Sequence, residues 1–261
     1  MPPDDDPPSS PTLYDRPSTP AAGPAKLAAR FRAVREIARG GMGRVVEAID
    51  IELGRTVAVK QVLSTHPDAR RRFEREIAIT ARLEHPSIVP LYDAGTSLNG
   101  DPFYVMRKLT GAPLDHVIRD ATTLDRRLLL LPNLLAVADA VAHAHGRGVL
   151  HRDLKPSNVL VGDLGDTVVI DWGLAKIVGD PDDPLSNDQP QPGSSLRTVA
   201  GAVIGTPGFM APEQVTGDPV DARSDVYALG ACLYYLLAGA PPISGGSETE
   251  ILTRTVSGDV S

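Results

Sequence analysis

The sequence has almost no cysteine. Cys232 is the only one among 261 residues. A single cysteine excludes an internal disulfide and any metal site built from several cysteines, and it fits a reducing compartment. We therefore expect a cytoplasmic protein. Cys232 stands in an apolar stretch, so we interpret it as a small core residue in preference to a reactive thiol.

Positive charge is also scarce. The chain has 26 Lys and Arg residues against 33 Asp and Glu residues, which gives a formal net charge of -7. A protein that binds the phosphate backbone of nucleic acids needs a basic surface, so we expect no nucleic-acid partner. Histidine offers no zinc site either, because His143 and His145 lie two positions apart on a predicted helix and point to different faces.

Long apolar runs are missing as well. The longest, "VYALGACLYYLLAGAPP" from Val226, contains glycines and is shorter than the ~18 to 20 residues that a membrane span needs. No basic start followed by an apolar segment predicts a secretory signal. We expect no membrane segment within this chain, so tethering would need residues outside it, and we interpret the Val226 run as a buried helix.

The composition divides the chain into three regions. Residues 1–30 are rich in Pro, Asp and Ser and lack periodic apolar positions, which predicts a disordered tail. Residues 31–107 have strand-like patterns with one helix, and residues 108–261 are mainly helical, which predicts an α+β protein with two lobes. A polar, Pro-rich stretch at 179–198 predicts a long loop inside the second lobe.

The glycine-rich stretch "ARGGMGRVV" at 38–46 has two interpretations. It is either a loop that folds over the phosphates of a nucleotide or a tight turn between two strands. The following runs "RVVEAI" and "TVAVKQV" predict a hairpin that turns at Gly54. A dinucleotide-binding fold needs glycines that open a helix, so the strand that follows disfavours that fold.

Lys60 lies on the second strand of this hairpin. Strand alternation places it on the same face as Ala58 and Val62. On its own, a lysine there is as compatible with a solvated residue at a sheet edge as with a functional residue. The next helix changes that balance.

The helix "RRFEREIAITARLEHP" carries a carboxylate on its packing face. Burying an unpaired charge is costly, so the inward-facing Glu76 needs a partner, and Lys60 is the natural candidate. Glu74 lies off this face and is predicted to be exposed. The stripe itself, by helical spacing, consists of Phe73, Glu76, Ile77, Thr80 and Leu83.

A cluster of polar residues follows a second predicted helix, in "HRDLKPSNVL" from His151 and "VVIDWG" ending at Gly173. Taken singly, Asp153 is compatible with a helix cap, and Asn158 and Asp171 with turns. Taken together they fit phosphoryl transfer from ATP, which needs metal ions, a cationic contact and an aligned acceptor. Asp171 and Asn158 would supply metal ligands, Asp153 would accept the proton of the incoming hydroxyl, and Lys155 would balance charge on the phosphoryl group.

The motifs agree with one family in order and spacing over residues 31–261. They are the glycine stretch, "VAVK", the helix glutamate, "HRDLKPSN", "DWG", "GTPGFMAPE" and "SDVYALG". The chain resembles the eukaryotic-type serine/threonine protein kinases, of the kind also found in bacteria. Lys155 and Thr206 match the serine/threonine kinases in preference to the tyrosine kinases.

The resemblance implies a two-lobed kinase fold, with a small β-rich lobe at 31–107 and a larger helical lobe at 108–261. It implies transfer of the γ-phosphate of ATP to Ser or Thr hydroxyls of protein substrates, with Mg²⁺, or Mn²⁺ as the alternative, as the metal. It also allows self-association for phosphorylation in trans. A pseudokinase or scaffold that binds nucleotide or partners without turnover is the alternative function.

The resemblance also implies a nucleotide site. The glycines would cover the phosphates, Lys60 would hold the α- and β-phosphates, Met106 would be the gatekeeper, and residues 107–109 would be the hinge. The full expected site consists of Ile37, Ala38, Arg39, Gly40, Gly41, Met42, Gly43, Arg44, Val45, Ala58, Lys60, Glu76, Met106, Lys108 and Leu109.

Three features depart from the family pattern. Ala38 replaces the first glycine of the loop, and Trp172 stands where phenylalanine is usual. The chain also ends soon after "PPISGG", where the family continues with further helices that include an arginine partner for Glu213. We therefore expect a truncated domain with an exposed apolar patch on the helix at 226–237.

Regulation is expected in the segment between Asp171 and Glu213. Arg152 precedes Asp153 and offers a cation that a phosphate on this segment would engage. Thr198 is the first candidate for that phosphate, and Ser194 and Ser195 are weaker ones. The alternative is a surface insert whose polar residues serve only solubility.

Overall fold

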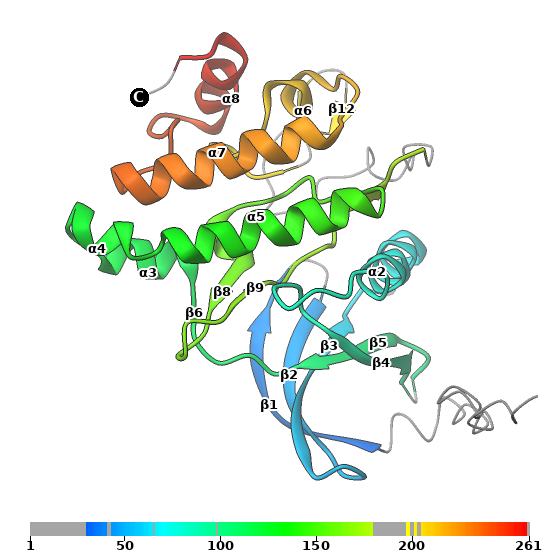
Figure 1. Ribbon diagram of the computed structural model, residues 1–261. Helices are drawn as coiled ribbons and strands as arrows, with labels where there is room; N and C mark the ends of the chain where they lie inside the picture. The colour runs from blue at the N-terminus through cyan, green and yellow to red at the C-terminus, as the bar shows by residue number, and fades with distance from the viewer. Residues whose placement is uncertain are drawn as a thin grey trace, which may run out of the picture.

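Two lobes make up the computed structural model (Figure 1). The first contains a sheet and one main helix, and the second is mostly helical, so the predicted α+β, two-lobed architecture is confirmed. Residues 1–29 of the expected tail and most of the expected polar loop lie outside the residues that the structure describes, whereas Arg30 is described and binds Asp50. The described residues are 30–40, 43–64, 66–97, 99–179, 197–198, 201–202 and 205–259.

The sheet of the first lobe has five antiparallel strands in the order β1-β2-β3-β5-β4. The predicted hairpin is present as β2 and β3, and Gly54 takes the positive φ of 63° that its turn requires. Alternating apolar residues of β2, β3 and β5 form a small core on one face of this sheet. The strands are β1 (Phe31–Arg39), β2 (Gly43–Asp50), β3 (Arg55–Val62), β4 (Leu91–Thr96) and β5 (Pro102–Arg107).

Helix α2 (Pro67–Thr80) packs against the other face of the sheet. Proline is favoured in the first turn of a helix, where its missing N–H costs nothing. The predicted stripe is largely right, because Phe73, Glu76 and Thr80 are buried, although Ile79 is buried more fully than the expected Ile77. Glu74 is exposed, as predicted. The carboxylate of Glu76 therefore points into the protein.

Two long helices, α5 (Leu131–Gly146) and α7 (Ala222–Ala238), lie side by side in the second lobe (Figure 1). They share the largest core of the molecule, to which both contribute small and apolar side chains. Cys232 is buried there, as predicted, and burial raises the pKa of its thiol to about 12. The shorter helices are α3 (Leu114–Asp120), α4 (Leu124–Leu128), α6 (Pro212–Thr216) and α8 (Glu248–Ser257).

Short strands fix the loops of the second lobe. Val169 forms a parallel bridge with Ile88, which joins the end of β9 to the segment after α2. The loop between β7 and β8 and the segment after β9 are therefore held next to the first lobe. These elements are β6 (Ala112–Pro113), β7 (Val149–Leu150), the 3-10 helix η1 (Pro156–Asn158), β8 (Val159–Val161), β9 (Thr167–Val169), β10 (Lys176–Ile177), β11 (Arg197–Thr198) and β12 (Gly201–Ala202).

The apolar helix α7 is only partly buried. Val226, Leu233 and Leu237 are exposed by 58%, 38% and 39% and lie on one side of the helix. The Val226 run is thus a helix, as predicted, but one stripe of it faces outward. Glu213, whose family partner was expected to be absent, accepts a hydrogen bond from the Ser224 hydroxyl.

One stretch among the described residues, Leu124–Gly146, is long and apolar enough by length and composition to cross a membrane. The stretch is longer than the Val226 run, on which the expectation of no membrane segment rested. In the structure the stretch comprises α4 and α5, and the buried face of α5 packs in the core of the helical lobe.

Candidate active site

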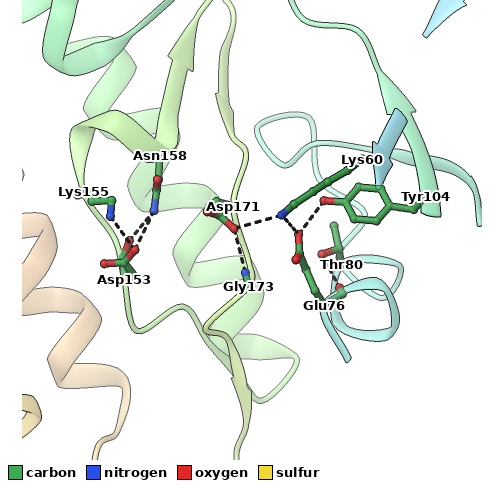
Figure 2. Close-up of polar contacts among 9 residues, drawn as sticks. All are labelled: Lys60, Glu76, Thr80, Tyr104, Asp153, Lys155, Asn158, Asp171 and Gly173. Carbon is green, nitrogen blue, oxygen red and sulfur yellow. Dashed lines mark hydrogen bonds and ion pairs between the residues drawn. The ribbon is translucent and has the colours of Figure 1, made fainter. Parts of the chain in front are cut away.

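The predicted contact between Lys60 and Glu76 is present. The Lys60 ammonium donates a 2.6 Å hydrogen bond to Glu76 Oε1 (Figure 2). Strand β3 supplies the lysine and helix α2 supplies the glutamate. The Glu76 side chain is 1% exposed and the Lys60 side chain 15%. The carboxylate is therefore inside the lobe, and the lysine side chain beside it is largely buried.

Tyr104 on β5 is a third member of this group, which the sequence analysis did not identify. Its hydroxyl donates a 2.7 Å hydrogen bond to the same Glu76 oxygen. Its ring stacks on Phe73 of α2, with ring centroids 5.3 Å apart. Burial, helped by the Glu76 charge, raises the pKa of Tyr104 well above its usual value, so the hydroxyl remains a donor. Glu76 is thus held by two donors from two strands.

Asp171 brings the second lobe to Lys60. Its Oδ1 lies 3.8 Å from the Lys60 ammonium and accepts a 3.1 Å hydrogen bond from the Gly173 amide (Figure 2). Desolvation raises the pKa of Asp171, but the Lys60 charge and the Gly173 amide outweigh it and keep that pKa below its usual value. Desolvation lowers the pKa of Lys60, and the charges of Glu76 and Asp171 reverse that shift, so Lys60 is an ammonium at neutral pH.

Asp153 is the centre of a second polar group, formed by the loop after β7. One of its oxygens accepts a 2.9 Å hydrogen bond from the Thr206 hydroxyl, and the other lies 2.9 Å from the Lys155 ammonium. Lys155 also donates to Thr206. The Asn158 amide donates to the Asp153 backbone carbonyl at 2.9 Å. The structure thus brings Thr206 to Asp153 and Lys155, which lie 53 and 51 residues earlier in the chain.

Asp225 of α7 fixes the loop that carries Asp153. The two oxygens of Asp225 accept hydrogen bonds of 2.8 Å and 2.9 Å from the amides of His151 and Arg152. His145 contacts the same carboxylate at 2.7 Å. Arg152 has a φ of 67°, the only positive value for a non-glycine residue in the described part of the chain. Such a backbone costs energy, so its surroundings must hold it.

Trp172 packs on this loop. It is buried, with its ring centroid 4.7 Å from that of His151. Burial lowers the pKa of His151, so the imidazole is neutral at physiological pH.

The glycine hairpin is formed by strands β1 and β2. Gly40 and Gly43 do not adopt positive φ values. Gly43 is needed for another reason, because a Cβ there would lie 2.0 Å from the backbone oxygen of Gln61, whereas one at Gly40 would meet nothing within 4 Å. Gly41 and Met42 lie outside the described residues.

Not all side chains of the hairpin face Lys60. Val45 pairs with Lys60 across β2 and β3 and lies on its face. Arg44, one residue earlier, donates a 2.9 Å hydrogen bond to Gln61 on the opposite face. The Arg39 side chain binds Glu36. These two arginines therefore offer only backbone groups towards Lys60, and Ile37 and Ala38 are exposed.

The expected hinge follows β5. Met106 pairs with Ala58 of β3 and is half-buried. Lys108 donates a 2.8 Å hydrogen bond to Glu47 of β2, a contact that the sequence analysis did not foresee. Leu109 is half-buried.

The described residues test little of the expected regulation. The Nε of Arg152 donates a 3.0 Å hydrogen bond to the carbonyl of Leu174, so this cation already contacts the segment that begins at Asp171. Thr198 is described only through its backbone, as part of β11, and Ser194 and Ser195 lie outside the described residues.

The donors available to a metal ion are few. Within the described ranges, no group of three or more His, Cys, Asp or Glu side chains could hold a metal. Asp171 offers a carboxylate and Asn158 an amide oxygen. That set fits Mg²⁺, which usually takes one or two protein carboxylates and completes its shell with phosphates and water.

Sequence comparisons agree with this arrangement. The family model described as "Protein kinase domain" matches residues 31–259. The chain belongs to the protein kinase family. The kinase fold and the bacterial serine/threonine branch that the motifs predicted are therefore confirmed.

Several similar proteins are serine/threonine kinases from bacteria. Serine/threonine-protein kinase PknD of Protochlamydia amoebophila is 35% identical over 241 residues, which cover 84% of this chain and 24% of that protein. The DNA damage-responsive kinase RqkA of Deinococcus radiodurans is 38% identical, over 88% of this chain and 33% of that protein. PknB of Mycobacterium leprae is 38% identical, over 90% and 37%. This kinase chain thus spans a quarter to about a third of the length of these relatives.

Proposed function

We propose that this protein is an ATP-dependent kinase of serine and threonine side chains in proteins. The observation that carries the proposal is the joint presence of two groups. Lys60, Glu76 and Asp171 form one, where phosphates and metal would bind. Asp153, Lys155 and Thr206 form the other, where an acceptor hydroxyl would lie. Phosphoryl transfer depends on positioning and on charge compensation, and these groups supply both.

Residues of both lobes would hold the nucleotide and its metal. Glu76 fixes the Lys60 ammonium, which would contact the α- and β-phosphates. Asp171 and Asn158 would hold Mg²⁺, or Mn²⁺ in its place. When bound, the metal would supply positive charge that neutralises the negative charge developing during transfer. The expected backbone contacts of Gly40, Gly43, Lys108 and Leu109 would place the rest of the nucleotide.

Asp153 would orient the Ser or Thr hydroxyl of the substrate. The oxygen of that hydroxyl attacks the γ-phosphorus, the bond from that phosphorus to the β-phosphate oxygen breaks, and ADP leaves. The hydroxyl proton passes to the Asp153 carboxylate. Proton acceptance of this kind contributes roughly 10² to 10⁴ in rate. Lys155, 2.9 Å from Asp153, would stabilise negative charge on the transferred group.

A pseudokinase would lack part of this set. Here Lys60, Asp153, Asn158 and Asp171 are all present, and the relatives carry the names of kinases. The alternative of a nucleotide-binding scaffold therefore has no observation in its favour.

The remaining expectations belong to the same proposal. We infer a kinase domain that starts at residue 31 with lobes that meet near residue 107, protein substrates, action in the cytoplasm and self-association for phosphorylation in trans. Activation would follow phosphorylation of Thr198, or of Ser194 or Ser195, with Arg152 as the cation that binds the phosphate.

The proposal is tested by Mg²⁺-dependent transfer of labelled γ-phosphate from ATP to the protein itself and to a basic protein substrate. We expect incorporation that is abolished in Asp153→Asn. Glu76→Gln should lower the rate at least tenfold, because Lys60 loses its charged partner. Glu74→Gln is the matched control, two residues away on the exposed side of α2, and should stay within twofold. Equal incorporation in Asp153→Asn would contradict the proposal.

A further inference from the structure

One carboxylate connects both strands of the glycine hairpin to the hinge. Glu47 Oε1 accepts the 2.8 Å hydrogen bond from Lys108, and Glu47 Oε2 lies 2.8 Å from the Arg35 guanidinium of β1. The Glu47 side chain is 14% exposed and that of Lys108 24%, whereas Arg35 is 63% exposed. The contact with Lys108 is thus the shielded one of the two.

Strand register places this contact on the face that carries Lys60. Val45 pairs with Lys60, and Glu47 pairs with Ala58. Paired residues and alternate residues of antiparallel strands share a face, so Glu47 is on the Lys60 face, one pair nearer the hinge. Ala58 in turn pairs with Met106, two residues before Lys108.

Strand β1 of this hairpin has little burial, whereas β2 pairs with β3 along its whole length. All residues of β1 from 32 to 39 are exposed, and β1 is the edge strand of the sheet. Of this strand, Phe31 packs on the core of β2, β3 and β5. A segment with so little burial opens easily unless specific contacts hold it.

Arg107, the other cation of the hinge, forms a more exposed contact than Lys108 does. Arg107 lies 3.1 Å from Asp166, but the two side chains are 39% and 53% exposed. Exposed ion pairs contribute little, whereas charge-assisted hydrogen bonds shielded from water are the strong ones. In agreement, the hydrogen bond from Lys108 is the main cause that lowers the pKa of Glu47.

We propose that Lys108 and Glu47 are positioning residues that hold the β1–β2 hairpin against the hinge and thereby set the affinity for ATP. The inference rests on the proposed kinase function, because it assigns the hairpin to the nucleotide. It adds a side-chain role to Lys108, which the family resemblance uses only through its backbone.

Two measurements test it on the whole chain. The first is hydrogen exchange of the amides of residues 31–50 without nucleotide, which does not depend on any activity. The second is the Kd for ATP by calorimetry with Mg²⁺, followed by kcat and KM. The variants are Lys108→Met, Lys108→Arg, Glu47→Gln and the double variant. Arg119→Met is the control, because its pair with Asp115 in α3 is also an ion pair but lies in the other lobe.

We expect Lys108→Met and Glu47→Gln to speed exchange of the hairpin amides and to weaken ATP binding about tenfold. KM should rise while kcat stays within about twofold, because the lost interaction stabilises the bound substrate and the transition state equally. The double variant should be no worse than either single variant, because the two residues act through one contact. Lys108→Arg and Arg119→Met should bind ATP within about twofold of the unchanged protein.

Unchanged hairpin exchange in Lys108→Met would overturn the inference, and so would faster exchange with unchanged ATP affinity. Additive losses in the double variant would also overturn it. These outcomes leave the kinase function standing if the unchanged protein binds and transfers phosphate. If the unchanged protein binds no ATP, the proposed function and this inference fail together.

Discussion

The hydroxyl of Tyr104 and the carboxylate of Glu76 form a buried hydrogen bond of 2.7 Å. The oxygen that accepts it also accepts the hydrogen bond from Lys60. Tyr104 therefore fixes the position of helix α2 from the neighbouring strand, independently of the lysine.

Tyr104→Phe should destabilise the protein by about 1 to 2 kcal/mol, because a buried carboxylate oxygen loses one of its two donors. The Lys60 contact should survive, so phosphate transfer should fall by less than about tenfold. The free energy of unfolding in urea measures the first effect. Tyr92→Phe, on an exposed ring of β4, is the control and should change that energy by less than about 0.5 kcal/mol. Equal losses in both variants would contradict the assignment.

Thr206 should matter through its hydroxyl alone. That group donates to Asp153 and accepts from Lys155, so Thr206→Val removes one hydrogen bond from each of them. We expect kcat to fall about tenfold or more, the equivalent of one such hydrogen bond. Thr206→Ser keeps the hydroxyl and should stay within about threefold. A serine variant as slow as the valine variant would show that the methyl group is what counts.

The two glycines of the hairpin offer a paired test of packing. Gly43→Ala places a Cβ 2.0 Å from the backbone oxygen of Gln61, which should force β2 and β3 apart and cost about 2 kcal/mol or more. Gly40→Ala meets no atom within 4 Å and should be nearly neutral in stability. Thermal unfolding of the two variants measures the difference, and similar melting temperatures would refute this account of Gly43.

Asp225 should make stability fall in acid. Burial raises its pKa, but the contact with His145 and the amides of His151 and Arg152 outweigh burial and leave that pKa below its usual value. A carboxyl with a lowered pKa in the folded state stabilises the protein above about pH 4, and that stabilisation is lost as the pH falls towards the folded pKa.

Urea unfolding from pH 7 to pH 3 measures this effect. Asp225→Asn should be less stable at pH 7 and should lose less stability below about pH 4 than the unchanged protein. Asp221→Asn is a useful comparison, because Asp221 is exposed at the start of the same helix. An identical acid dependence with and without Asp225 would contradict the assignment.

The Lys60 and Glu76 pair could be predicted because local patterns place both residues. Strand alternation and helix periodicity put two opposite charges on facing surfaces, and the cost of burying one alone forces them together. The loop from His151 to Asn158 was recognisable for a similar reason, since its polar residues are close in sequence.

Other parts of the site depend on contacts that no local pattern contains. The "PFYVMR" run predicts a buried strand but not where the Tyr104 hydroxyl points. Glu47 and Lys108 are 61 residues apart, and Asp225 lies 73 and 74 residues from the amides it binds. Gly43 must lack a side chain because the backbone of Gln61, on the next strand, occupies the space that a Cβ would need. Only the assembled fold brings these groups within reach of each other.

The hydrogen bonds from the loop to Asp225 also determine when this loop can adopt its structure during synthesis on the ribosome. The chain emerges from its N-terminus, so Asp153 is made long before α7. Until Asp225 has left the exit tunnel, nothing accepts the amides of His151 and Arg152, and the left-handed backbone of Arg152 has no reason to persist. The loop that carries Asp153 is therefore expected to take its final shape only when translation has passed α7.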